Sequence, residues 1–95
     1  MAVKTTQRQG SWKHSRRVAW RKVADEAVIL DVETAVYYSL GGPGLRIWEL
    51  IGEGRSAGEI GRLLAEEYEA SEDEIREDCV ELAERLRKEG LLERA

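Results

Sequence analysis

The sequence has no phenylalanine and only one cysteine, one histidine, one proline and one methionine among its 95 residues. The lone cysteine, Cys79, excludes an internal disulfide. No apolar run approaches the roughly 20 residues that a transmembrane helix needs, and the chain does not open with a secretion signal. We therefore expect a cytoplasmic protein without a membrane segment.

Residues that could perform catalysis are equally scarce. The only histidine, His14, lies in the predicted tail and the only cysteine, Cys79, in the core of a predicted helix, so we expect no pair of nucleophile and base and no cluster of metal ligands. The glycine-rich segment 41–44 lacks the Lys-Ser/Thr pair of a phosphate-binding loop. The sequence thus predicts a protein that is not an enzyme and needs neither a cofactor nor a metal.

Acidic residues are absent from the first 22 positions, which hold seven Lys and Arg, whereas residues 23–95 hold 8 basic and 19 acidic residues. Apolar periodicity is weak before Val18, which predicts a basic, disordered tail over residues 1–17 and a folded domain over residues 18–95. A basic arm that docks on an acidic partner, or folds back on the acidic domain, is the alternative.

Three short segments rich in β-branched and aromatic residues, 18–23, 27–32 and 35–40, are separated by polar pairs. This pattern predicts a three-stranded antiparallel meander. Because side chains alternate between the two faces of a strand, one apolar face of the second strand and one of the third should pack against the helices. We expect these faces to be Val28, Leu30 and Val32 in the second strand, and Val36, Tyr38 and Leu40 in the third.

The rest of the chain has helical spacing. Pro43 suits a first helical turn, and apolar residues then recur up to the glycines at 52 and 54. Two Ser-x-x-Glu capping boxes, at Ser56 and Ser71, open two further helices, the last of which extends to Gly90. The predicted fold is α+β, a winged helix-turn-helix-like arrangement in which a three-stranded antiparallel sheet is followed by three helices (β-β-β-α-α-α).

An ordered set of short motifs resembles the PqqD-like family of RiPP recognition elements, which bind the leader peptides of ribosomally made precursors. The motifs are Leu-Asp at 30–31, Tyr-Tyr at 37–38, Trp48, Asp-Cys at 78–79 and Gly-Leu-Leu at 90–92. Within that family the chain most resembles the stand-alone lasso-peptide B1 proteins. This resemblance implies binding of a precursor leader peptide and its presentation to a B2-type leader peptidase, with the cyclase as a further candidate partner.

The chain departs from the family pattern at two positions. Ala35 stands where the family often has glycine, which leaves the turn before the third strand undetermined because alanine tolerates positive φ poorly. Cys79 replaces an aliphatic residue, and we interpret it as a small buried thiol.

The third strand also predicts peptide binding on physical grounds. Segment 35–40 contains no proline and no charge, so its free edge is unprotected and could pair with an extended peptide by β-augmentation. Cover by the chain's own tail or by a second copy is the alternative. We expect the peptide to lie between this strand and the last helix, and Arg76 to pair with acidic leader positions. The predicted leader-binding residues are Ala35, Val36, Tyr37, Tyr38, Ser39, Leu40, Ile75, Arg76, Cys79, Val80 and Leu82.

A winged-helix DNA-binding regulator is the competing hypothesis, because its fold would look the same. In such proteins the last helix enters the major groove and lysine and arginine neutralise phosphates. Segment 71–90 instead holds eight acidic and four basic residues. No sequence-specific binding to nucleic acid is therefore expected, although the basic tail leaves non-specific contact open.

Overall fold

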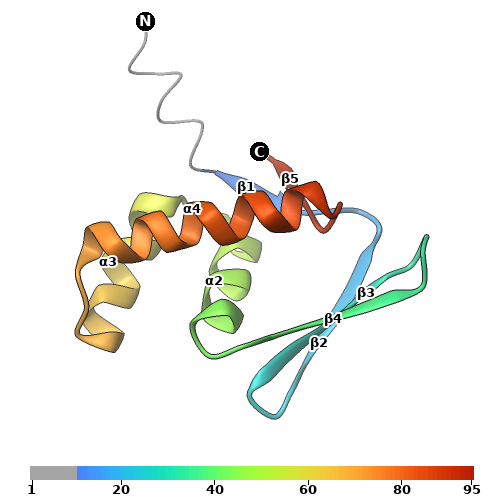
Figure 1. Ribbon diagram of the computed structural model, residues 1–95, viewed down its shortest axis with the longest axis horizontal. Helices are drawn as coiled ribbons and strands as arrows, with labels where there is room; N and C mark the ends of the chain where they lie inside the picture. Colours follow the sequence, from blue (N-terminus) through green and yellow to red (C-terminus); the bar gives the residue numbers. More distant parts are fainter. Residues whose placement is uncertain (1–10) are drawn as a thin grey trace, which may run out of the picture.

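Two small sheets and three helices make up the part of the chain that the computed structural model describes, residues 11–95 (Figure 1). The predicted α+β fold, with a three-stranded antiparallel sheet followed by three helices, is confirmed. An additional short strand precedes the sheet and another follows the helices. The elements are β1 (Trp12–His14), β2 (Val18–Val23), β3 (Glu26–Asp31), β4 (Val36–Gly41), α2 (Pro43–Gly52), α3 (Ala57–Tyr68), α4 (Glu72–Lys88) and β5 (Leu92–Arg94).

The three-stranded sheet has the order β2-β3-β4, so β2 and β4 are its edges. Asp31 closes the turn from β3 to β4, since its Oδ1 accepts hydrogen bonds from the backbone N–H groups of Glu33 and Thr34 at 3.0 and 3.3 Å. Ala35 follows with a φ of 62° and donates its N–H to the Asp31 carbonyl at 2.8 Å. The turn therefore uses the left-handed conformation at a residue other than glycine, which is costly for alanine.

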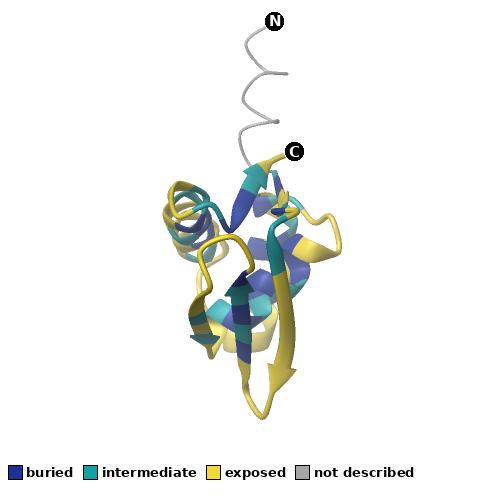
Figure 2. Cartoon of the chain, turned by 90° about the vertical axis from the view of Figure 1, so that its right-hand side faces the viewer, coloured by how far each residue is buried: buried dark blue, intermediate teal, exposed yellow. Residues whose placement is uncertain are grey.

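The sheet buries a different face of β3 from the one that the sequence predicted. Ala27, Ile29 and Asp31 are buried, whereas Val28 and Leu30 are only partly covered on the opposite face. The middle strand in Figure 2 accordingly alternates between buried and intermediate residues. The prediction for β3 was wrong because both faces of this strand carry apolar residues. For β4 it was correct at two of the three positions, since Tyr38 and Leu40 pack against the core while Val36 is 45% exposed.

Side-chain caps define the starts of the second and third helices. Ser56 and Glu59 form the predicted reciprocal capping box, with N–H to side-chain distances of 3.2 and 3.0 Å. Ser71 Oγ accepts the N–H of Glu74 at 3.4 Å at the start of α4. Between these helices Gly61 allows close approach, because a Cβ at this position would lie 3.0 Å from the Glu72 carbonyl oxygen.

The folded domain begins before the predicted boundary at residue 18. β1 pairs antiparallel with β5, with Trp12 opposite Arg94. The Trp12 side chain is only 2% exposed, and its Nε1–H donates to Glu84 Oε2 at 2.9 Å. Burial of this large indole and pairing with the C-terminal strand fix residues 12–17 to the domain. The remainder of the predicted tail, residues 1–10, lies outside the described residues.

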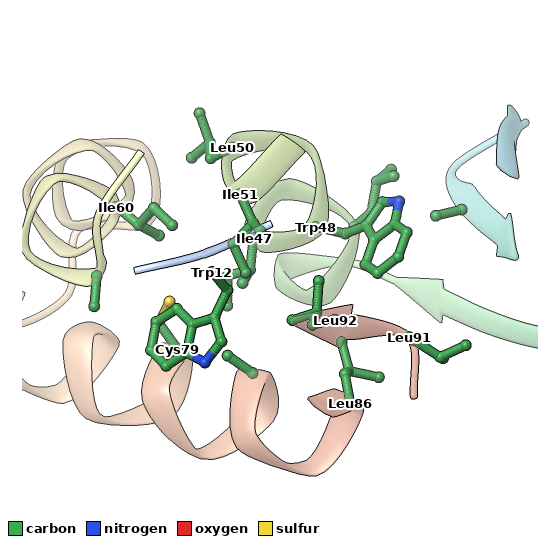
Figure 3. Close-up of a cluster of buried hydrophobic side chains, with 14 of the residues drawn as sticks. Trp12, Ile47, Trp48, Leu50, Ile51, Ile60, Cys79, Leu86, Leu91 and Leu92 are labelled. Atoms are coloured by element: carbon green, nitrogen blue, oxygen red, sulfur yellow. The ribbon is translucent and has the colours of Figure 1, made fainter. Parts of the chain in front are cut away.

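The hydrophobic core lies where α2, α4 and the β1–β5 ribbon meet. Figure 3 shows Trp12 between α2 and α4, with Cys79 beside it and Leu92 close by. The core also extends under the sheet through Trp48 and Ile29, both 0% exposed. None of the three helices has the length and apolarity required to cross a bilayer, in the range that the structure describes.

Candidate functional site

Within residues 11–95, the outer edge of β4 presents backbone groups that no other strand pairs with. Just after β3, the backbone N–H of Val32 donates to the carbonyl of Arg17, just before β2, at 2.8 Å. Every second residue of β3 shares this direction, so the backbone groups of Leu30 and Val28 also bond toward β2. The intervening residues of β3 bond toward β4, so Ile29 exchanges backbone hydrogen bonds with Tyr38, which lies opposite it. Because N–H and C=O groups alternate in direction along an antiparallel strand, those of Tyr37 and Ser39 point away from the sheet.

The sequence of β4 leaves this edge accessible. Val36–Gly41 reads VYYSLG and has no charge or proline, the usual devices that prevent an edge from pairing. Among residues 11–95 no strand other than β3 pairs with β4. The opposite edge, β2, carries Arg21 and Lys22. The structure thus contains one protected edge and one that can accept a further strand.

Helix α4 borders the open edge. A Cβ on Gly44 would lie 3.7 Å from Leu40 Cβ and 3.9 Å from Leu82 Cδ2, so the middle of α4 meets the end of β4. The end of α4 meets the start of β4 through Arg17, which hydrogen-bonds the Glu89 carbonyl at 3.5 Å and pairs with Asp31 at 2.9 Å. Asp31 in turn lies opposite Val36, the first residue of β4.

The second half of α4 and β4 therefore run side by side in opposite directions. The helical stretch from Leu82 to Lys88 rises about 9 Å, and the strand from Leu40 to Val36 spans about 13 Å. We call the backbone edge of β4 and the flank of α4 that includes Ile75, Asp78 and Leu82 the edge site. An antiparallel fourth strand bound there would run in the same direction as α4.

Some of the side chains predicted to bind a leader peptide lie at the edge site. Tyr38 and Leu40 on β4 and Ile75 and Leu82 on α4 are partly exposed and pack against the border of the core. Val36 and Ser39 are exposed along β4, and Ala35 lies in the turn before it. These residues can contact an added strand.

Three predicted residues lie elsewhere on α4. Cys79 is 0% exposed and faces the core, and burial raises the pKa of its thiol to about 12. Arg76 lies on the α3 side, where its Cβ would be 3.2 Å from a Cβ on Gly61. Val80, one turn later, follows Arg76 on the same flank. These three residues therefore lie off the flank of α4 that borders β4; the sequence could not separate them because one helix face serves both core and edge site.

The backbone and the side chain of Tyr37 lie on two different surfaces. Its backbone groups belong to the edge site, but its side chain, 67% exposed, lies on the sheet face turned away from the helices. On that face it lines a shallow hollow of about 220 Å³ with Ala19, Arg21, Val28 and Leu30. We call this surface the outer face. The sequence analysis missed it because Val28 and Leu30 were predicted to be covered by the helices.

A second hollow adjoins the edge site and was also missed. Its volume is about 200 Å³, and it opens among α2, α3 and α4. Its walls are mainly apolar, and Asp78 is the charged residue in its lining. No single sequence motif signals it, since the lining residues come from separate elements: Pro43, Ile47, Leu64, Tyr68, Ala70, Ile75 and Asp78.

Two carboxylates with lowered pKa values, Asp31 and Glu84, are held in ion pairs with arginines. Asp31 is 1% exposed, and burial raises its pKa, but hydrogen bonds from Glu33, Thr34 and Arg17 outweigh burial and hold that pKa below its usual value. Glu84 has its pKa lowered to about 2 by hydrogen bonds from Arg87, Arg94 and Trp12. Across residues 11–95 no three acidic, His or Cys side chains come together as a metal-binding group.

Comparison with known proteins places this arrangement in a family. The model of the coenzyme PQQ synthesis protein D (PqqD) family matches residues 26–92. The solved structure of TbiB1 in complex with the TbiA(beta) leader peptide is 32% identical, with a TM-score of 0.80 over 85% of this chain and 94% of that chain. Comparison with curated protein sequences gives no significant match.

Two further solved structures share the fold at lower identity. A lasso peptide synthetase B1 complexed with its leader peptide is 19% identical, with a TM-score of 0.81 over 87% of this chain and 98% of that one. The PqqD truncation of Methylobacterium extorquens PqqCD, described as a stand-alone RiPP recognition element, is 21% identical, with a TM-score of 0.73 over 87% and 88% of the two chains. As the sequence motifs predicted, the chain belongs to the PqqD family of RiPP recognition elements.

Proposed function

We propose that this protein binds the leader peptide of a ribosomally made, lasso-type precursor without catalysing a reaction, and that the peptide adds to β4 as a fourth antiparallel strand. The observation that carries this proposal is the uncharged, unpaired edge of β4, bordered by the partly apolar flank of α4. Backbone bonds to an edge strand provide affinity, and neighbouring side-chain pockets provide selectivity. The leader-bound relative TbiB1, 32% identical, supports the same class of ligand.

Backbone pairing alone would bind a peptide weakly. The N–H and C=O groups of Tyr37 and Ser39 offer four hydrogen bonds, each contributing about 0.5–1.5 kcal/mol net. A micromolar complex requires about 8 kcal/mol beyond the cost of association. The remaining free energy has to come from apolar leader side chains packed on Leu40, Ile75 and Leu82. We therefore expect a leader segment with apolar residues on the side that faces α4.

The outer face supports the second part of the proposal, presentation of the bound leader to the leader peptidase. An antiparallel sheet commonly exposes a polar face, but here Val28, Leu30 and Tyr37 give the exposed face an apolar centre. Exposed apolar patches of this kind mark protein interfaces. A leader strand added to β4 would extend this face, so the peptidase could contact the protein and its bound leader together.

A substitution pair on β4 tests the mode of binding. Tyr37→Pro removes an outward N–H, whereas Tyr38→Pro removes an N–H that bonds to β3. The probe is a synthetic lasso-type leader peptide, beginning with TbiA(beta), the ligand of the 32% identical relative, and it is titrated by fluorescence polarisation. We expect Tyr37→Pro to fold and to bind at least tenfold more weakly, and Tyr38→Pro to be destabilised because it breaks the ladder.

Tyr37→Ala is the matched control, because it keeps the backbone N–H and removes only the outer-face side chain. We expect it to bind the leader with nearly unchanged affinity but to support slower cleavage by the purified leader peptidase. Full leader affinity in a well-folded Tyr37→Pro variant would refute binding at the β4 edge. Unchanged cleavage with both Tyr37→Ala and Leu30→Lys would refute docking of the peptidase on the outer face.

A further inference from the structure

Among the described residues, Arg85 differs from the other arginines of α4 in having no ionic partner. Arg76 pairs with Asp73 at 3.2 Å, and Arg87 pairs with Glu84 at 2.9 Å. Within residues 11–95 no carboxylate lies within 4.0 Å of the Arg85 guanidinium, although Glu81 and Glu89 are each one turn away on the same helix. The exposed Arg85 is therefore a cation available to a ligand.

Helix geometry places Arg85 on the flank that borders β4. Asp78, Leu82 and Arg85 are spaced i, i+4 and i+7, so they follow one another along one side of α4. Leu82 lies beside Gly44, close to the end of β4, and the helix then runs toward the start of that strand. Arg85 thus comes next after Leu82 along the edge site. Arg76, which is paired, lies on the opposite flank.

We propose that Arg85 selects an acidic side chain in the leader peptide, an inference that rests on the proposed function. The peptide would run in the same direction as α4, so its side chains would meet the hollow at Ile75 and Asp78, then Leu82, then Arg85. Along the helix these steps are about 5–8 Å each, close to the roughly 6.7 Å between alternate residues of a strand.

The edge site therefore fits a leader segment in which every second residue faces α4 and each of these residues meets a different part of the site. An apolar residue at position i enters the hollow of about 200 Å³, a second at i+2 packs on Leu40 and Leu82, and an aspartate or glutamate at i+4 pairs with Arg85. Asp78, the charged residue in the lining of the hollow, disfavours an acid at position i. β4 has no charge, so Arg85 is the cation that follows Leu82 on this flank of α4 and that an acid at i+4 would meet there.

The test is a selection from an mRNA-displayed library of random ten-residue peptides, carried out in parallel with the full chain and three variants. The variants are Arg85→Gln, Arg85→Glu and the control Arg76→Glu, which reverses a charge on the opposite flank of the same helix. We expect the parent and the control to enrich Asp or Glu at i+4. Arg85→Gln should lose this enrichment, and Arg85→Glu should replace it with Lys or Arg.

A peptide selected by the parent provides the quantitative readout. Its affinity for Arg85→Glu should be about three- to tenfold lower, and a Glu→Lys change at i+4 in the peptide should restore it. Selected peptides with no acidic preference, or with a preference that Arg85→Glu leaves intact, would overturn the role of Arg85 and leave leader binding in place. If no chain selects any peptide above the background of an unrelated protein, the proposed function fails together with this inference.

Discussion

Trp12 should contribute more to stability than any exposed residue of β1, although it lies in a segment that composition alone predicts to be disordered. Its side chain is 2% exposed, and truncation of a buried aromatic residue to alanine costs about 3–5 kcal/mol. A domain of this size has a free energy of unfolding of about 4–13 kcal/mol. Trp12→Ala should therefore remove about a quarter or more of the stability, and the variant should be largely unfolded if the parent lies at the low end.

Two variants separate burial from hydrogen bonding at this position. Trp12→Phe keeps an aromatic ring but loses the Nε1–H bond to Glu84, which should cost about 1–2 kcal/mol. Lys13→Ala changes the exposed neighbour, whose ammonium is 4.0 Å from Glu93, and should stay within about 0.5 kcal/mol of the parent. Urea denaturation followed by far-ultraviolet circular dichroism gives all three values. A Trp12→Ala variant within 1 kcal/mol of the parent would refute the docking of β1 on α4.

Three further predictions concern stability and reactivity. Burial lowers the pKa of His14, and its hydrogen bond to the Trp48 carbonyl compensates in part. As the pH falls, the unfolded chain therefore binds a proton at His14 before the folded protein does, so the free energy of unfolding should decrease below about pH 6.5. A His14→Phe variant should lack this dependence between pH 7 and 5. Cys79, with its raised pKa, should resist a thiol reagent in the native protein and react on unfolding in urea; rapid native reaction would contradict its burial. Gly61→Ala should destabilise the protein by about 1–3 kcal/mol through the close contact with α4. The control Gly58→Ala, at an exposed position of the same helix, should be neutral or stabilising by up to about 1 kcal/mol. Equal melting temperatures for the two variants would exclude the close contact.

Local signals in the sequence were sufficient to predict the helices. The Ser56–Glu59 box, the serine at 71 and the glycine at 90 all lie at helix ends in the structure, where Gly90 has a φ of 83°. Capping depends on residues three or four positions apart, so it can be recognised without knowledge of the tertiary fold.

Features that depend on distant residues were not predictable in the same way. Either face of β3 could be buried, because Ile29 and Leu30 are equally suited to a core, and α2 decides which of them is covered. β1 is only three residues long and lies among basic residues, so its pairing with β5 depends on a contact between the two ends of the domain. The division of α4 into a core face, a flank toward α3 and a flank toward β4 likewise follows from the positions of its neighbours.

The proposed fourth strand is tested most directly by amide hydrogen exchange, measured by NMR with and without a saturating leader peptide. Tyr37 and Ser39 have outward N–H groups, so their exchange should slow by at least tenfold on binding, whereas Tyr38, already bonded to β3, should change little. Saturated leader binding without protection of Tyr37 and Ser39 would contradict the account. Protection of Trp20, on the opposite edge, would place the peptide on β2 instead.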